Sequence, residues 1–171
     1  ILILTFAWSL KGMTDSLGAK YFVRDFVQTS ATGVQMLLPV IVFAIGCLLA
    51  FATGTSWGTF GILIPIVQNV FSMDDPMAIV CISACMAGAV CGDHCSPISD
   101  TTIMASAGAQ CDHVNHVSTQ LPYAITCAAV SGVTYLIAGL LVHFGITGMI
   151  ALPIGIVLML GTLFVIRQAT G

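Results

Sequence analysis

The sequence from residue 92 to residue 102 reads Gly-Asp-His-Cys-Ser-Pro-Ile-Ser-Asp-Thr-Thr. It places two carboxylates and four hydroxyls around a proline, in a chain that is 58% hydrophobic and only 6% charged. A carboxylate at bilayer depth costs at least about 2.5 kcal/mol on insertion scales, so such a group usually belongs to an ion or proton pathway. We therefore interpret Asp93 and Asp100 first as parts of such a pathway.

The composition excludes an ordinary soluble domain, in which about 25% of residues are charged. The 171 residues have a mean hydropathy of +1.06. Neither the interval between Asp25 and Asp74 nor that between Asp112 and Arg167 contains a Lys, Arg, Asp or Glu. Each interval has room for a spanning helix of about 20 apolar residues. We expect an all-α, multi-pass protein of the cell membrane, with residues 1–171 forming a single transmembrane domain.

Apolar runs separated by polar breaks predict the helices. We expect them at residues 34–53, 60–71, 77–91, 103–109, 122–143 and 146–166, with a polar connection at 111–120 and Asp75-Pro76 as a helix start. The run at 60–71 reaches only about 18 Å, short of a hydrocarbon core of about 30 Å. A re-entrant hairpin with its tip at 54–59 fits these lengths. Residues 92–102 then interrupt a discontinuous helix.

Both breaks are rich in oxygen donors, which hard cations prefer. Non-helical backbone at membrane depth is tolerated where it lines a cavity, and transporters build ion sites at such breaks. The candidate cation- and proton-binding residues are Asp93, Asp100, Ser96, Ser99, Thr101, Thr102, Thr55, Ser56 and Thr59. Asp15 is either a further pathway carboxylate or a solvated loop residue.

Simpler interpretations stay open for both breaks. Asp100 precedes Thr101-Thr102-Ile103 and could only cap a helix. Gly54 and Gly58 form a G-x-x-x-G pair that could serve close helix packing alone, and Trp57 could be an interfacial anchor.

The cysteines and histidines raise one alternative of another class. Most of the seven cysteines lie in apolar runs, where cysteine behaves as a small hydrophobe. Cys111, His113 and His116 have partly suitable spacing for zinc, as in a membrane scaffold or sensor, but no full four-ligand pattern is present. No arrangement of a nucleophile and a base indicates an enzyme.

Several segments of this sequence together resemble the NhaC-type sodium/proton antiporter family. The resemblance lies in residues 51–61 (Phe-Ala-Thr-Gly-Thr-Ser-Trp-Gly-Thr-Phe-Gly), in residues 92–102, and in the loop at 111–117 with 119–123. Ala7-Trp8 with Thr14-Asp15 is similar but less specific. The resemblance implies an ion-transporter fold with inverted repeats, re-entrant hairpins and broken helices.

The same resemblance implies Na⁺ and H⁺ as transported ions, with no cofactor. Some members of that family exchange malate or lactate, or move amino acids, and such a coupled transporter is the alternative function. The chain starts at Ile1, inside an apolar segment, so we expect it to be the C-terminal part, the second repeat, of a longer transporter. The expected partners are the lipid bilayer and the first repeat of the same protein. A homodimer stays open, and no basic patch suggests nucleic acid.

Overall fold

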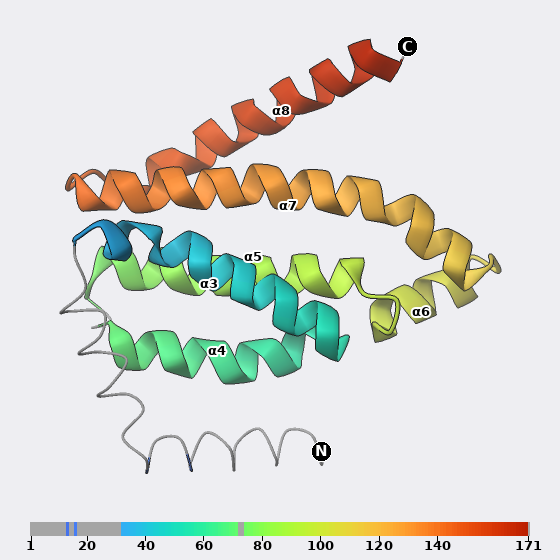
Figure 1. The fold of residues 1–171 in the computed structure, drawn as a ribbon, viewed down its shortest axis with the longest axis horizontal. Coiled ribbons are helices and arrows are strands. Elements are labelled where there is room, and N and C mark those ends of the chain that lie inside the picture. The colour runs from blue at the N-terminus through green and yellow to red at the C-terminus, as the bar shows by residue number, and fades with distance from the viewer. Residues whose placement is uncertain (1–12, 14–15, 17–31, 72–73, 171) are drawn as a thin grey trace.

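A computed structural model of the chain describes Met13, Ser16, residues 32–71 and residues 74–170 (Figure 1). Asp15, the candidate further pathway carboxylate, lies outside the described residues. All regular structure in the described ranges is helical, as the sequence predicts. Four stretches, in α3, α5, α7 and α8, are long and apolar enough to cross a membrane.

Helices α3 (Thr32–Thr53) and α4 (Ser56–Val70) form an antiparallel hairpin (Figure 1). The turn between them consists of Gly54 and Thr55 only. Gly54 has a φ of +66°, a conformation that glycine adopts without a steric penalty. The expected break at 54–59 is therefore too long, because residues 56–59 already belong to α4. With 15 residues, α4 is about 22 Å long and shorter than a hydrocarbon core.

Helix α5 (Pro76–Cys95) begins as predicted and ends later than predicted. The Asp75 carboxylate accepts a hydrogen bond from the Met77 amide at 2.8 Å, which caps the helix. The expected end at residue 91 is wrong, because the helix continues through Asp93 to Cys95. Pro97 explains where it stops: a proline drives the preceding residue out of the helical region, and Ser96 has φ −80° and ψ 127°.

The second arm of the discontinuous helix is α6 (Asp100–Gly108), which starts three residues earlier than expected. The break itself is confined to residues 96–99. A tight turn leads from α6 into α7 (His113–His143), which has 31 residues. The expected polar connection at 111–120 is wrong, because the Asp112 carboxylate accepts from the Asn115 amide at 2.9 Å and starts the helix there. Polar residues thus form the first turns of α7.

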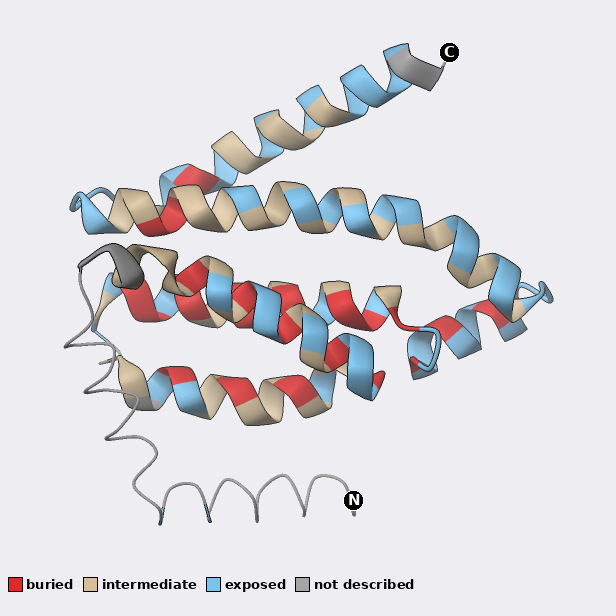
Figure 2. Ribbon diagram, viewed as in Figure 1, coloured by how far each residue is buried: buried red, intermediate tan, exposed pale blue. Residues whose placement is uncertain are grey.

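Helix α8 (Ala151–Thr170) follows a short 3-10 turn, η1 (Gly148–Ile150), so it starts five residues later than expected. It runs back along α7 and diverges from it (Figure 1). In the most apolar stretch of α5, half of the residues are buried, whereas in the most apolar stretch of α8 only 6% are buried (Figure 2). Helix α5 is therefore the centre of the bundle, and α8 is its exposed edge.

Glycines let α5 approach α3 closely. A Cβ on Gly88 would lie 2.2 Å from the Phe43 carbonyl oxygen, and one on Gly92 would lie 2.1 Å from that of Cys47. Real Cβ atoms are not found at such distances, so the interface requires glycine at both positions. Small residues at a helix interface are typical of packing in membranes.

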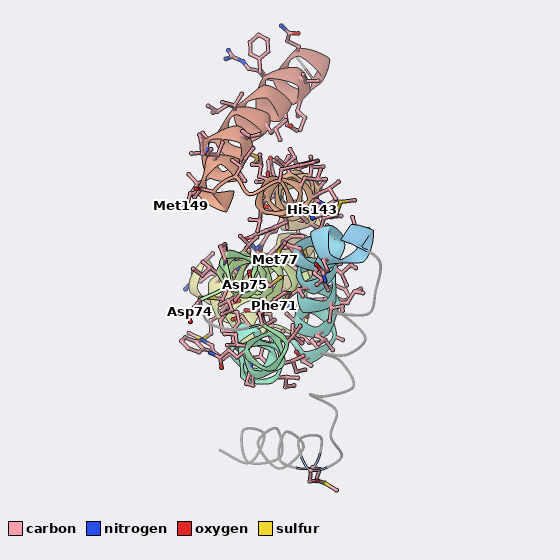
Figure 3. All side chains as sticks on the ribbon, turned by 90° about the vertical axis from the view of Figure 1, so that its left-hand side faces the viewer. Phe71, Asp74, Asp75, Met77, His143 and Met149 are labelled. Carbon is pink, nitrogen blue, oxygen red and sulfur yellow. The ribbon has the colours of Figure 1, made fainter. Side chains whose placement is uncertain are left out.

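A hydrophobic cluster closes the bundle at the end opposite the two breaks. Its buried members are Val67 of α4 with Met77 and Cys81 of α5. Phe71 packs against this cluster, and Figure 3 looks onto this end, where Phe71 and Met77 are labelled. The cluster ties α4 to α5 at one end of the bundle.

We predict that Gly88→Ala lowers the stability of the protein. The added methyl group would meet backbone rather than a movable side chain, and overpacking of this kind typically costs about 1–3 kcal/mol. The apparent melting temperature of the full-length protein, purified in detergent, should fall by several degrees. Gly61→Ala in α4 is the matched control, since a Cβ there has no heavy atom within 4 Å. Equal melting temperatures for the two variants would contradict this account of the interface.

Candidate functional site

The two breaks lie against each other in space. A Cβ on Gly54 would lie 2.7 Å from the Ile98 carbonyl oxygen, so the α3–α4 turn contacts the α5–α6 break through backbone. The Ser96 hydroxyl, which is fully buried, donates to the Phe51 carbonyl at 2.8 Å. Segments about 40 residues apart in the sequence therefore form one polar region at one end of the bundle.

Short-range hydrogen bonds order the break at residues 96–99. The Ser96 amide donates to the Asp93 carbonyl at 3.0 Å, and the Ser99 amide donates to the Ser96 carbonyl at 3.3 Å. The hydroxyls of Ser99 and Thr101 are 2.7 Å apart. Because these bonds link the end of α5 to the start of α6, the break has a defined conformation.

Asp93 is the most unusual group in this region. It lies in the last turn of α5, its side chain is 2% exposed, and its Oδ1 atom has no hydrogen-bond partner among the described residues. An ionised carboxylate in such surroundings is costly unless a cation or a proton neutralises it. The environment of Asp93 therefore suits a group that binds and releases a cation or proton.

Asp100 has a different environment from Asp93. It is exposed, it is the first residue of α6, and its carboxylate accepts from the Thr101 amide at 2.8 Å. A carboxylate in the first turn interacts favourably with the free N–H groups and the dipole of a helix. The N-cap of α6 is Ser99, so Asp100 is not the cap itself, but it interacts with the start of the helix in the first turn. Asp93 has no such role, because it lies at the end of α5.

The predicted hydroxyl donors divide into buried and accessible groups. The candidate residues that are at most 3% exposed are Thr59, Asp93, Ser96, Ser99 and Thr102. Thr55 and Ser56 are half-buried, and Thr101 is exposed. The Thr59 hydroxyl donates to the Thr55 carbonyl at 3.0 Å, which leaves the oxygen lone pairs of Thr59 available as ligands.

The two glycines of the hairpin, Gly54 and Gly58, have different surroundings. Gly54 makes the close contact with Ile98, but a Cβ on Gly58 would meet only the side chain of Thr55, the cap of its own helix. Among the described residues, Gly58 therefore takes no part in packing between helices. Trp57 is 78% exposed, as an interfacial anchor would be.

The side chains of two of the three residues of the zinc alternative, Cys111 and His113, have other partners. The His113 ring lies within hydrogen-bond distance of the Pro97 carbonyl and of the Ser106 hydroxyl, and Cys111 donates weakly to the Ser106 carbonyl. Within the described ranges, no three His, Cys, Asp or Glu side chains gather in a way that could hold a metal ion. Ser106 could not be predicted from the sequence, because its contact with His113 spans a turn and has no local sequence signal.

Comparison with known proteins gives a family and several relatives. The model of the Na⁺/H⁺ antiporter family matches residues 1–140. An uncharacterized protein of Haemophilus influenzae is 43% identical over 94% of this chain and 30% of its own length. The malate-2H⁺/Na⁺-lactate antiporter of Bacillus subtilis is 29% identical over 77% of the chain and 26% of its own length.

Another relative is the arginine/ornithine antiporter of Halobacterium salinarum, 32% identical over 66% of the chain and 24% of its own length. The chain thus spans less than a third of the length of these relatives. No solved structure matches it. The family match covers most of the chain and includes both breaks, and the four apolar helices make this a multi-pass membrane protein. The chain belongs to the Na⁺/H⁺ antiporter family.

Proposed function

We propose that the protein to which this chain belongs is a secondary active transporter that exchanges Na⁺ for H⁺ across the cell membrane. The observation that carries this proposal is Asp93, a buried carboxylate with an unpartnered oxygen next to a helix break. Family membership supports Na⁺ and H⁺ as the transported ions. It also indicates a transporter rather than an enzyme.

Competition for one carboxylate would couple the two ion fluxes. Ionised Asp93 without a partner is costly inside the protein, so either Na⁺ or a proton would occupy it at each stage of the cycle. Na⁺ arriving from one side displaces the proton, and a proton arriving from the other side displaces Na⁺. The same cost would suppress movement of the empty, charged site across the membrane.

The buried hydroxyls would complete the ion site. Ser96, Ser99, Thr102 and Thr59 are the best candidates, since each is buried and each has oxygen lone pairs that can face a cation. We assign Thr55, Ser56 and Thr101 to its accessible side. Asp100 would contribute negative charge near the entrance, and Asp15 remains a candidate for another part of the pathway.

Other parts of the transporter would complete this half of the pathway. We propose that the first repeat of the same protein packs against this chain, related to it as an inverted repeat, with the α3–α4 hairpin re-entrant in the bilayer. The greater length of the relatives supports this proposal. We keep a homodimer as a further proposal.

We predict that Asp93→Asn abolishes Na⁺-dependent proton movement. The amide keeps the size of the side chain but can neither bind a proton nor balance a cation. Full-length protein in inside-out membrane vesicles should show no pH change on addition of Na⁺ when a pH-sensitive dye is used. Asp100→Asn should keep a reduced rate, because Asp100 is exposed and bonded to its own helix.

Asp74→Asn is the matched control for this substitution, since Asp74 is an exposed residue before α5 at the opposite end of the bundle (Figure 3). It should exchange ions like the wild type. Full exchange by Asp93→Asn, or loss of exchange in Asp100→Asn alone, would contradict the assignment of the exchangeable charge to Asp93.

We predict that Thr59→Val weakens Na⁺ binding. Valine keeps the shape of threonine but removes a ligand oxygen, so the half-saturating Na⁺ concentration should rise about tenfold, the typical effect of losing one polar contact. The measurement is the Na⁺ dependence of the same vesicle assay. Thr162→Val in α8 is the matched control, because Thr162 makes the same bond to the carbonyl four residues earlier. An equal, small change in both variants would remove Thr59 from the site.

A second candidate function is exchange of organic anions or amino acids coupled to Na⁺ or H⁺. The names of the Bacillus and Halobacterium relatives favour it. A substrate carboxylate could bind at the start of the helix that follows each break, α4 or α6. Helix α4 has no acidic residue in its first turn, whereas α6 has Asp100 there, so the start of α4 is the better place.

The two functions predict different results in proteoliposomes. A simple Na⁺/H⁺ exchanger should acidify or alkalinise the interior on addition of Na⁺ alone. A coupled exchanger should move ²²Na⁺ only when malate, lactate, arginine or ornithine is present on one side. Na⁺-driven proton movement that needs no organic solute would exclude the second function as the principal one.

A further inference from the structure

The side chain of His113 connects three separate segments of the chain. It is the first residue of α7, and its Nε2 atom lies 2.7 Å from the Pro97 carbonyl oxygen in the break. Its Nδ1 atom lies 3.0 Å from the hydroxyl of Ser106 in α6. Ser106 is 3% exposed, so this second contact lies in the packed interior between α6 and α7.

The chemistry of the Pro97 contact fixes which atom donates. A carbonyl oxygen only accepts, so Nε2 of His113 carries a hydrogen and donates it. Pro97 lies between α5 and α6, so its carbonyl is outside the hydrogen-bond ladder of either helix. His113 supplies a donor to this carbonyl, which no helix ladder uses.

Three consecutive residues of the break are thus held by different elements. The Ser96 hydroxyl donates to Phe51 at the end of α3, and the Ile98 carbonyl packs on Gly54 in the α3–α4 turn. Pro97, between them, is held from α7. The Ser96 amide in turn bonds to the Asp93 carbonyl, so the position of the break is transmitted to the last turn of α5.

We infer that His113 is a positioning residue for the ion site: its bond to the Pro97 carbonyl holds the α5–α6 break against the α3–α4 turn, and so orients Asp93 and Ser96. The effect on transport rests on the proposed function, whereas the effect on the break does not. A set of variants can distinguish the contribution of the Nε2 contact from that of the Nδ1 contact. The amide nitrogen of glutamine occupies roughly the place of Nε2, and that of asparagine roughly the place of Nδ1.

The first experiment measures hydrogen–deuterium exchange of the purified full-length protein by mass spectrometry. His113→Ala and His113→Asn should exchange faster in peptides that cover residues 96–106, while His113→Gln should stay close to the wild type. His143→Ala, at the other end of α7, is the matched control and should leave these peptides unchanged. Faster exchange throughout the protein would instead indicate a general loss of stability and would contradict a positioning role.

The second experiment measures Na⁺-dependent proton movement in vesicles. His113→Ala and His113→Asn should raise the half-saturating Na⁺ concentration about tenfold, with a smaller change in the maximal rate. His113→Gln should have a half-saturating Na⁺ concentration close to that of the wild type. The inference would be overturned if asparagine, and not glutamine, restored the half-saturating Na⁺ concentration. It would also be overturned if residues 96–106 of the alanine variant showed the hydrogen–deuterium exchange of the wild type. Should the alanine variant not fold, the comparison of glutamine with asparagine decides.

The two experiments also distinguish the inference from the proposed function. The hydrogen–deuterium exchange at residues 96–106 could change as expected while the half-saturating Na⁺ concentration stays the same. That result would overturn the link between His113 and the ion site. Absence of Na⁺-driven proton movement in the wild type would overturn the proposed function. In that case the exchange data alone decide whether His113 holds the break.

Discussion

The close approach of α5 to α3 is the constraint on which the rest of the structure depends. It exists because Gly88 and Gly92 present no side chain to the backbone carbonyls of Phe43 and Cys47. Within a bilayer, helices gain little from burying apolar surface against one another, so packing at short range takes over that role. Because the contact continues to Gly92, it reaches the last turn of α5 and fixes the residue that follows, Asp93.

Close packing near Asp93 makes its buried Oδ1 atom, which has no hydrogen-bond partner among the described residues, significant. A flexible region could rearrange so that a lysine or water reaches a buried charge. The segments around this break are instead held in place by backbone contacts and by the hydrogen bond of a buried hydroxyl. Among the described residues, Oδ1 of Asp93 has no hydrogen-bond partner. A small, exchangeable cation is the kind of partner that such a group accepts without rearrangement of the helices.

The sequence predicts the kinds of element well and their limits less well. The apolar runs, the start of α5 at Asp75-Pro76 and the interruption around Pro97 were all evident, because each depends on neighbouring residues. The sequence pattern does not predict the continuation of α5 through Asp93 or the start of α7 at His113, because polar residues in an apolar chain indicate helix ends rather than helix interiors. The difference between Asp93 and Asp100 could not be predicted, because burial depends on which helices pack around each residue.

The shortness of α4 has a consequence for how the protein enters the membrane. Its 15 residues offer an insertion machinery less apolar length than the longer helices, and Pro65 lies within them. Val67 finds its buried partners in α5, which is synthesised later. Stable integration of α4 therefore waits until α5 has emerged, so the α3–α4 hairpin and α5 form the smallest unit that assembles in the bilayer during synthesis.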